Sequence, residues 1–127
     1  GFGQEVSMTI PEFSASDIKL VQATLKERFG AAVVDKVEIK EAETEIRLSP
    51  ADRELTLCPA LFWIVGDCAF VVSRTGQAAY RAMFYYSVKD RFGTGQEEYD
   101  NLGDCLITLL KVQEEEQARR DGEGGIR

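Results

Sequence analysis

Few side chains in this sequence could do chemistry, and their types narrow the possibilities. The 127 residues include three cysteines, Cys58, Cys68 and Cys105, and no histidine. Without histidine, the common serine–histidine, cysteine–histidine and histidine–metal sites cannot form. The cysteine spacings match no zinc pattern, and each cysteine lies in an apolar stretch, where a thiol behaves as a small hydrophobic group. We therefore expect buried, reduced cysteines, no metal and no cofactor.

The acidic and glycine-rich stretches also give no strong evidence for a catalytic or binding site. The glutamates at 41, 43 and 45 fit a solvated hairpin tip better than a metal or acid–base cluster. The sequence Gly-Thr-Gly-Gln at 93–96 could bind phosphate at a helix N-terminus, but a lone G-x-G is a weak signal and Glu97 and Glu98 would repel an anion there. We assign no catalytic residue; the residues favour a protein that is not an enzyme, and they leave carboxylate or lysine chemistry open.

The phrase Thr-Gly-Gln-x-x-Tyr occurs at Thr75 and again at Thr94, and its two copies predict different structures. After Thr75, apolar side chains at every second position from 78 to 88 predict a β-strand, so Thr75–Gly76 should be a hairpin turn. After Thr94, apolar residues follow helical spacing, and Glu97 would complete a capping box with Thr94. This copy predicts a helix from about 96 to 118.

An arginine within the predicted strand is the strongest candidate for a binding residue. In a hairpin that turns at Thr75–Gly76, Arg81 lies opposite Phe70 and close to Trp63. An arginine among aromatic rings can stack on them, bind a carboxylate or extend to the solvent at the sheet edge. The candidate ligand- or partner-binding residues are Trp63, Phe70, Arg81, Met83 and Tyr85.

The first part of the chain predicts a helix followed by a hairpin. Residues 15–29 carry an apolar stripe at helical spacing, and Ser14 or Ser16 can cap its start. Across residues 37–48 the apolar positions change from odd to even numbers. A strand with one buried face cannot change parity, so this segment predicts a turn at Ala42–Glu43.

The middle of the chain predicts a second hairpin. Residues 55–65 and 68–74 are rich in β-branched and aromatic residues, and Gly66–Asp67 between them suits a two-residue turn. Pro59 cannot donate a ladder hydrogen bond, so we expect a bulge or bend there. This register pairs Trp63 with Phe70, Leu61 with Val72, Ile64 with Ala69 and Phe62 with Val71.

These elements predict an α+β fold: an N-terminal helix, a five-stranded antiparallel β meander and a C-terminal helix, with both helices on one face of the sheet. One domain would span residues 1–127, with a flexible N-terminal segment over 1–12 and a charged tail over 119–127. The central strands are apolar on both faces, and two helices cover only one. The other face must meet a second protomer, curl around a pocket or bind a different protein.

Composition excludes several functions. The formal net charge of −7 disfavours binding to nucleic acids and to anionic membranes. No apolar run approaches the roughly 18 residues of a membrane span. The first residues do not resemble a signal peptide, so we expect a cytoplasmic protein, with Met8 a candidate for the natural start.

The sequence thus predicts a non-enzymatic binding or regulatory protein whose apolar sheet face makes a homodimer or contacts a protein partner. The alternative is a small-molecule binding protein or enzyme, with an aromatic-lined cavity around Arg81 that takes a small apolar or anionic ligand. A third possibility is an acidic inhibitor that neutralises a basic partner.

Overall fold

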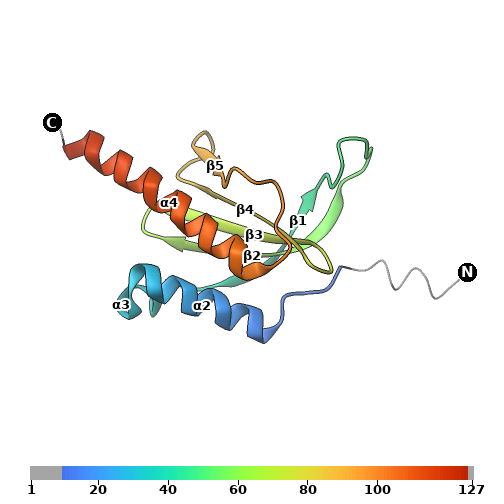
Figure 1. Cartoon of the computed structure of the whole chain (residues 1–127), viewed down its shortest axis with the longest axis horizontal. Coiled ribbons are helices and arrows are strands. Elements are labelled where there is room, and N and C mark those ends of the chain that lie inside the picture. Colours follow the sequence, from blue (N-terminus) through green and yellow to red (C-terminus); the bar gives the residue numbers. More distant parts are fainter. Residues whose placement is uncertain (1–9, 126–127) are drawn as a thin grey trace, which may run out of the picture.

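The computed structural model describes residues 10–125, which form a five-stranded antiparallel sheet with helices on one side (Figure 1). The elements are α2 (Ala15–Phe29), α3 (Ala31–Val34), β1 (Lys40–Ile46), β2 (Thr56–Val65), β3 (Cys68–Gly76), β4 (Ala79–Tyr85), β5 (Arg91–Gly93) and α4 (Leu102–Gly125). The strands follow one another in the sheet in chain order. This confirms the predicted α+β meander. Residues 1–9, including the candidate start Met8, lie outside the described residues.

The helix α2 begins and ends where the sequence predicts. The hydroxyl of Ser14 accepts the backbone N–H of Asp17, and the carboxylate of Asp17 accepts the N–H of Ser14, which makes a capping box. Gly30 ends the helix with φ at 91°, a conformation that other residues rarely adopt. Val21 and Leu25 on the inner side are fully buried, so the apolar stripe fixes α2 on the sheet.

The strand β1 is continuous, and the predicted turn at Ala42–Glu43 is wrong. β1 pairs with β2 in an unbroken register, and the chain turns later, where the N–H of Asp52 donates to the carbonyl of Ser49. The change of parity has another cause. Ile39 packs against the core beneath the helices, whereas Ile46 faces the opposite side of the sheet. A strand whose two ends are covered on different faces needs apolar residues of both parities.

The hairpin of β2 and β3 has the predicted register. Trp63 pairs with Phe70 and Leu61 with Val72, across the turn at Gly66–Asp67. The predicted bulge at Pro59 is absent, because the register of β1 and β2 continues through it. Pairing with β3 begins only at Ala60, so the missing N–H of Pro59 removes no hydrogen bond to β3.

The turn between β3 and β4 lies at residues 77 and 78, so the predicted turn at Thr75–Gly76 is displaced along the chain. Arg74 holds the observed turn in place, since its guanidinium donates to the carbonyl oxygens of Gly76 and Gln77. The register shifts between Arg74 and Gly76, as at a β-bulge. The sequence pattern predicted the strand, but a side chain beside the turn decided where the strand begins.

The helix α4 begins directly after Asn101, so the predicted start near residue 96 and the cap at Thr94 are wrong. The side-chain oxygen of Asn101 accepts the N–H of Asp104 over 2.8 Å. Thr94 instead accepts the hydroxyl of Tyr99 over 2.6 Å. Two backbone hydrogen bonds of 2.8 Å join Tyr99 to Tyr80 of β4. These contacts hold the chain before α4 against the end of the sheet.

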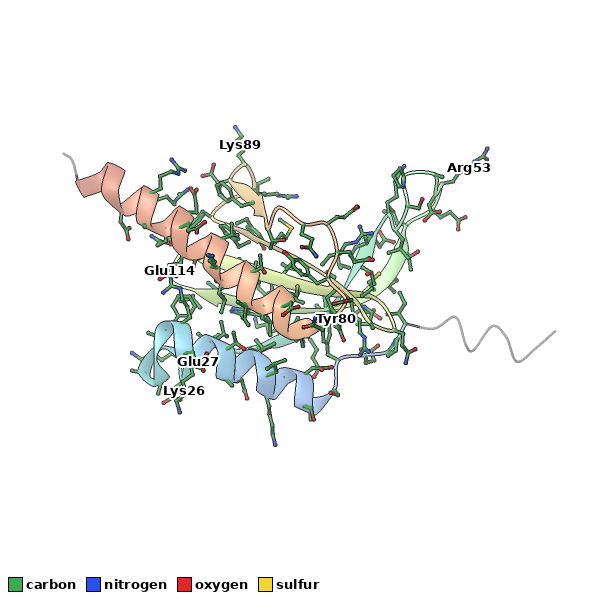
Figure 2. All side chains as sticks on the ribbon, in the orientation of Figure 1. Lys26, Glu27, Arg53, Tyr80, Lys89 and Glu114 are labelled. Atoms are coloured by element: carbon green, nitrogen blue, oxygen red, sulfur yellow. The ribbon has the colours of Figure 1, made fainter. Side chains whose placement is uncertain are left out.

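The core lies between the helices and one face of the sheet. Figure 1 shows α2 and α4 on the same side of the strands, and the C-terminal half of α4 extends past the sheet. Aromatic rings fill the layer between: the ring centroids of Phe84 and Phe92 lie 5.2 Å apart, and Phe84 is fully buried. Figure 2 shows Arg53 at the tip of the β1–β2 connection, far from the helices. That connection, together with β1, frames the site described next.

Candidate functional site

The face of the sheet opposite the helices, here called the far face, carries mostly apolar side chains. Cross-strand pairs bring together Cys58, Ala60, Phe62 and Ile64 of β2, Ala69, Val71 and Ser73 of β3, and Arg81, Met83 and Tyr85 of β4. Cys58, Ala60 and Ala69 are buried although the helices pack on the other face. The apolar second face predicted from the sequence is therefore present, and its small residues are shielded by the shape of the sheet.

That shape is a curl that makes the far face concave. Arg81 is on β4, three strands along the sheet from β1. Its guanidinium donates to the carbonyl oxygen of Leu48 over 3.0 Å and to that of Arg47 over 3.4 Å, just past the end of β1. In a flat sheet these strands would lie roughly 14 Å apart, at about 4.8 Å per strand, which is too far for one side chain. The chain leaving β1 therefore bends over the far face.

The curl forms an open pocket of about 530 Å³ on the far face, here called the far groove. It is lined by Thr44, Glu45 and Ile46 of β1, Val71 and Ser73 of β3, Arg81, Ala82 and Met83 of β4, and residues 93–97. Most of the surface of its lining is apolar, and Glu45 and Glu97 are its acidic lining residues. Its volume falls within the range of about 300–1,000 Å³ typical of ligand pockets.

Arg81 has a structural role in this groove, because its guanidinium connects separate segments of the chain. Its Nε donates to a carboxylate oxygen of Glu98 over 3.3 Å, and Glu97 lies 3.7 Å from Nη1. With the two backbone carbonyls already described, each of its three nitrogens has a protein partner. An anionic ligand would have to compete with two glutamates, so the arrangement disfavours the anion site that the sequence suggested.

The five residues predicted for the site lie on two faces of the sheet. Trp63 and Phe70 stack on each other beneath the helices, with ring centroids 5.6 Å apart, and both are fully buried. Arg81, Met83 and Tyr85 lie on the far face, and Arg81 and Met83 line the far groove. The predicted aromatic-lined cavity around Arg81 therefore does not form.

The β-bulge between Arg74 and Gly76 explains this separation, because it shifts the register beyond the turn by one residue. Phe70 lies opposite Phe84, and Arg81 lies opposite Ser73 instead of Phe70. Because the register differs from the predicted one by an odd number of residues, the β4 side chains change faces relative to β3. The prediction consequently missed Ser73, and the wrong turn at Ala42–Glu43 hid Ile46; both residues line the groove with Arg81. A serine directly after the apolar run 68–72 was the available signal for Ser73.

Ser73 differs from the other polar residues of the groove because it combines low exposure with the lack of a side-chain hydrogen bond to the described residues. Its side chain lines the pocket and the residue is only 5% exposed. Within the part of the chain that the structure describes, its hydroxyl has no hydrogen-bond partner, whereas the neighbouring hydroxyl of Thr75 donates to Glu98 over 2.7 Å. This hydroxyl is not among the buried polar atoms that lack a partner, so it is accessible from the groove. It can therefore form a hydrogen bond with a group that enters the groove.

The thiols do not supply a nucleophile. Burial raises the pKa of Cys68 to about 11 and the pKa of Cys105 to about 12. Burial also raises the pKa of Cys58, with the charge of Arg81 acting in the opposite direction. All three are buried, free cysteines, as predicted, and are protonated and inert at neutral pH.

Comparison with known proteins identifies no relative: no family model, no curated protein and no solved structure matches the chain. Among the described residues, no group of three or more potential metal-ligating side chains comes together. No helix in this part of the chain is both long and apolar enough to cross a membrane. The far groove is therefore the feature from which a function can be argued.

Proposed function

We propose that this protein is a non-enzymatic binding protein whose far groove takes up part of a partner protein. The observation that carries the proposal is a concave, mostly apolar groove, into which the hydroxyl of Ser73 opens without a hydrogen-bond partner among the described residues. Apolar surface that the helices leave uncovered gains free energy when another molecule covers it.

The groups around the groove support binding better than catalysis. Arg81 is held by Glu97, Glu98 and two backbone carbonyls. The nearby thiol of Cys58 has a raised pKa. The lining therefore offers no activated nucleophile and no arginine without partners, whereas its apolar wall suits contact with apolar side chains.

The surface beside the groove extends the apolar area. Ile64 is 52% exposed, and Phe62 and Tyr85 are half-buried on the same face. The partner can accordingly be a second copy of this chain, as the apolar strands suggested. Sedimentation at tens of micromolar protein, comparing wild type with Met83→Glu, tests this directly: a dimer that dissociates in the variant identifies the partner as a second copy.

A peptide-display selection against the wild-type protein tests the wider proposal. Met83→Glu places a charge in the groove wall, and Ile107→Glu places one on α4, where Ile107 is 61% exposed. We expect selected peptides that bind wild type and Ile107→Glu equally but lose affinity for Met83→Glu. Failure to obtain any peptide with this dependence, together with a monomeric wild-type protein, would contradict the proposal.

The volume of the far groove favours a second candidate, a small-molecule binding protein, because about 530 Å³ can hold a small ligand. A thermal-shift screen with neutral, apolar compounds tests it. A stabilising compound whose effect is lost in Met83→Glu but kept in Ile107→Glu would support this candidate. Hits that are insensitive to Met83→Glu would count against it.

A further inference from the structure

We propose that the partner segment binds as an added β-strand along the free edge of β1, and that its side chains alternate between basic and apolar. This inference rests on the proposed function and specifies the chemistry of the partner. It follows from three features: the unpaired edge of β1, the charges on one face of that strand, and the groove on its other face.

Among the residues that the structure describes, the outer edge of β1 has no neighbouring strand. β1 is the first strand in the described sheet, where it pairs with β2 alone, and most of its residues are exposed. Beyond the ladder with β2, no backbone hydrogen bond reaches β1 from the residues that the structure describes. An edge strand presents unpaired N–H and C=O groups, to which an extended peptide can add as another strand.

One face of β1 carries a row of negative charges. Glu41, Glu43 and Glu45 occupy alternate positions and therefore point to the same side of the strand. Within the described residues, none of them has an ion-pair partner. Opposite charges on adjacent strands stabilise a sheet. An added strand would thus be favoured if basic side chains occupy every second position.

The other face of β1 leads into the far groove. Thr44 and Ile46 line the groove, and every second side chain of an added strand would project on the same face beside them. Val71 and Met83 also line the groove that these side chains would face, and they favour apolar groups. Ser73 supplies the second, independent sign of a ligand, because the residue is only 5% exposed and its hydroxyl opens into the groove without a hydrogen-bond partner in the described part of the chain.

The same charges argue against a second copy of β1 as the added strand. Pairing two β1 strands would bring glutamates of one copy close to glutamates of the other, and like charges on adjacent strands destabilise a sheet. Each chain also carries a net charge of −7, which adds long-range repulsion. A basic segment from a different protein meets neither obstacle.

Three synthetic peptides separate the components of this proposal. The first, Lys-Val-Lys-Val-Lys-Val-Lys, has both basic and apolar positions. The second replaces each valine by serine and keeps the charge, and the third replaces each lysine by glutamate and keeps the apolar positions. Calorimetric titration gives affinity, and amide hydrogen exchange in the complex reports whether the backbone of β1 gains hydrogen bonds.

We expect the lysine–valine peptide to bind most tightly and to slow exchange along the outer edge of β1. Glu43→Lys should weaken its binding by about tenfold, since an attractive cross-strand pair becomes repulsive. Glu114→Lys on α4 makes the same change in net charge at another exposed glutamate and should leave binding nearly unchanged. The peptide comparison uses wild-type protein, so it holds even where a variant folds poorly.

Other outcomes overturn the inference in distinguishable ways. The lysine–serine peptide could bind as tightly as the lysine–valine peptide without slowing amide hydrogen exchange in β1. Binding would then be general charge attraction and not the addition of a strand. If the glutamate–valine peptide binds as tightly as the lysine–valine peptide, the glutamates of β1 do not select the partner. A dimer of wild type that dissociates in Met83→Glu would assign the groove to a second copy. In each case, selected peptides that lose affinity for Met83→Glu would still support the proposed function. If no such peptide is obtained and the wild-type protein is a monomer, both the proposed function and this inference are wrong.

Discussion

Arg81, which lines the far groove, and Glu98 form an ion pair, 3.3 Å from Nε to the carboxylate. The same carboxylate oxygen accepts the hydroxyl of Thr75 over 2.7 Å. Through its other nitrogens, Arg81 holds the backbone just past β1. One arginine thus joins β4, the chain leaving β1 and the segment before α4, and the shape of the groove depends on it.

Glu98→Gln should destabilise the fold more than Glu97→Gln. Glu98 contacts both Arg81 and Thr75, whereas the side chain of Glu97 is 78% exposed and lies 3.7 Å from Arg81. We expect a loss of about 1–2 kcal/mol for Glu98→Gln and within about 0.5 kcal/mol for Glu97→Gln, measured by urea unfolding. Equal losses would show that the contacts of Glu98 with Arg81 and Thr75 do not stabilise the fold.

Ser73→Ala and Thr75→Val test whether the hydroxyl of Ser73 is available to a ligand. Both residues are buried on β3, but only Thr75 has a hydrogen-bond partner in the described part of the chain. We expect Ser73→Ala to change the free energy of unfolding by less than about 0.5 kcal/mol and Thr75→Val to lower it by about 1–2 kcal/mol. A large loss for Ser73→Ala would mean that its hydroxyl already has a partner within the fold.

The protein should lose stability as the pH rises above about 9. Unfolded cysteines ionise near the ordinary pKa of 9.0, while burial raises the pKa of Cys68 to about 11 and that of Cys105 to about 12. Between these values the unfolded state has lost thiol protons that the folded state keeps, so alkali favours unfolding. Thermal unfolding across this range measures the effect, and Cys105→Ala should reduce its slope. A slope unchanged in that variant would contradict the role of Cys105.

Asn101→Ala should destabilise the start of α4. The side-chain oxygen of Asn101 accepts the N–H of Asp104 over 2.8 Å, and alanine cannot replace that contact. The expected loss is about 0.5–2 kcal/mol, compared with a few tenths for Asn101→Gly, measured by chemical unfolding. If the alanine and glycine variants were equally stable and close to wild type, Asn101 would not be the cap.

Part of the site could be predicted from the sequence. The face shared by Arg81 and Met83 follows from the alternation along β4, and both residues line the far groove. Their separation from Trp63 and Phe70 could not be predicted, because it depends on the β-bulge between Arg74 and Gly76, where the register shifts by one residue. A displacement by an odd number of residues leaves each strand intact but changes which side chains meet.

The sequence by itself determined the elements whose stability is local. The cap at Ser14, the stop at Gly30 and the turn at Gly66–Asp67 depend on neighbouring residues, so short-range patterns were enough to predict them. Only the tertiary structure decided the course of β1, the curl of the sheet and the partners of Arg81. Those features depend on contacts between distant residues, such as Arg81 with Leu48 and Glu98, whose distances no local pattern contains. The far groove exists because such long-range contacts bend the sheet.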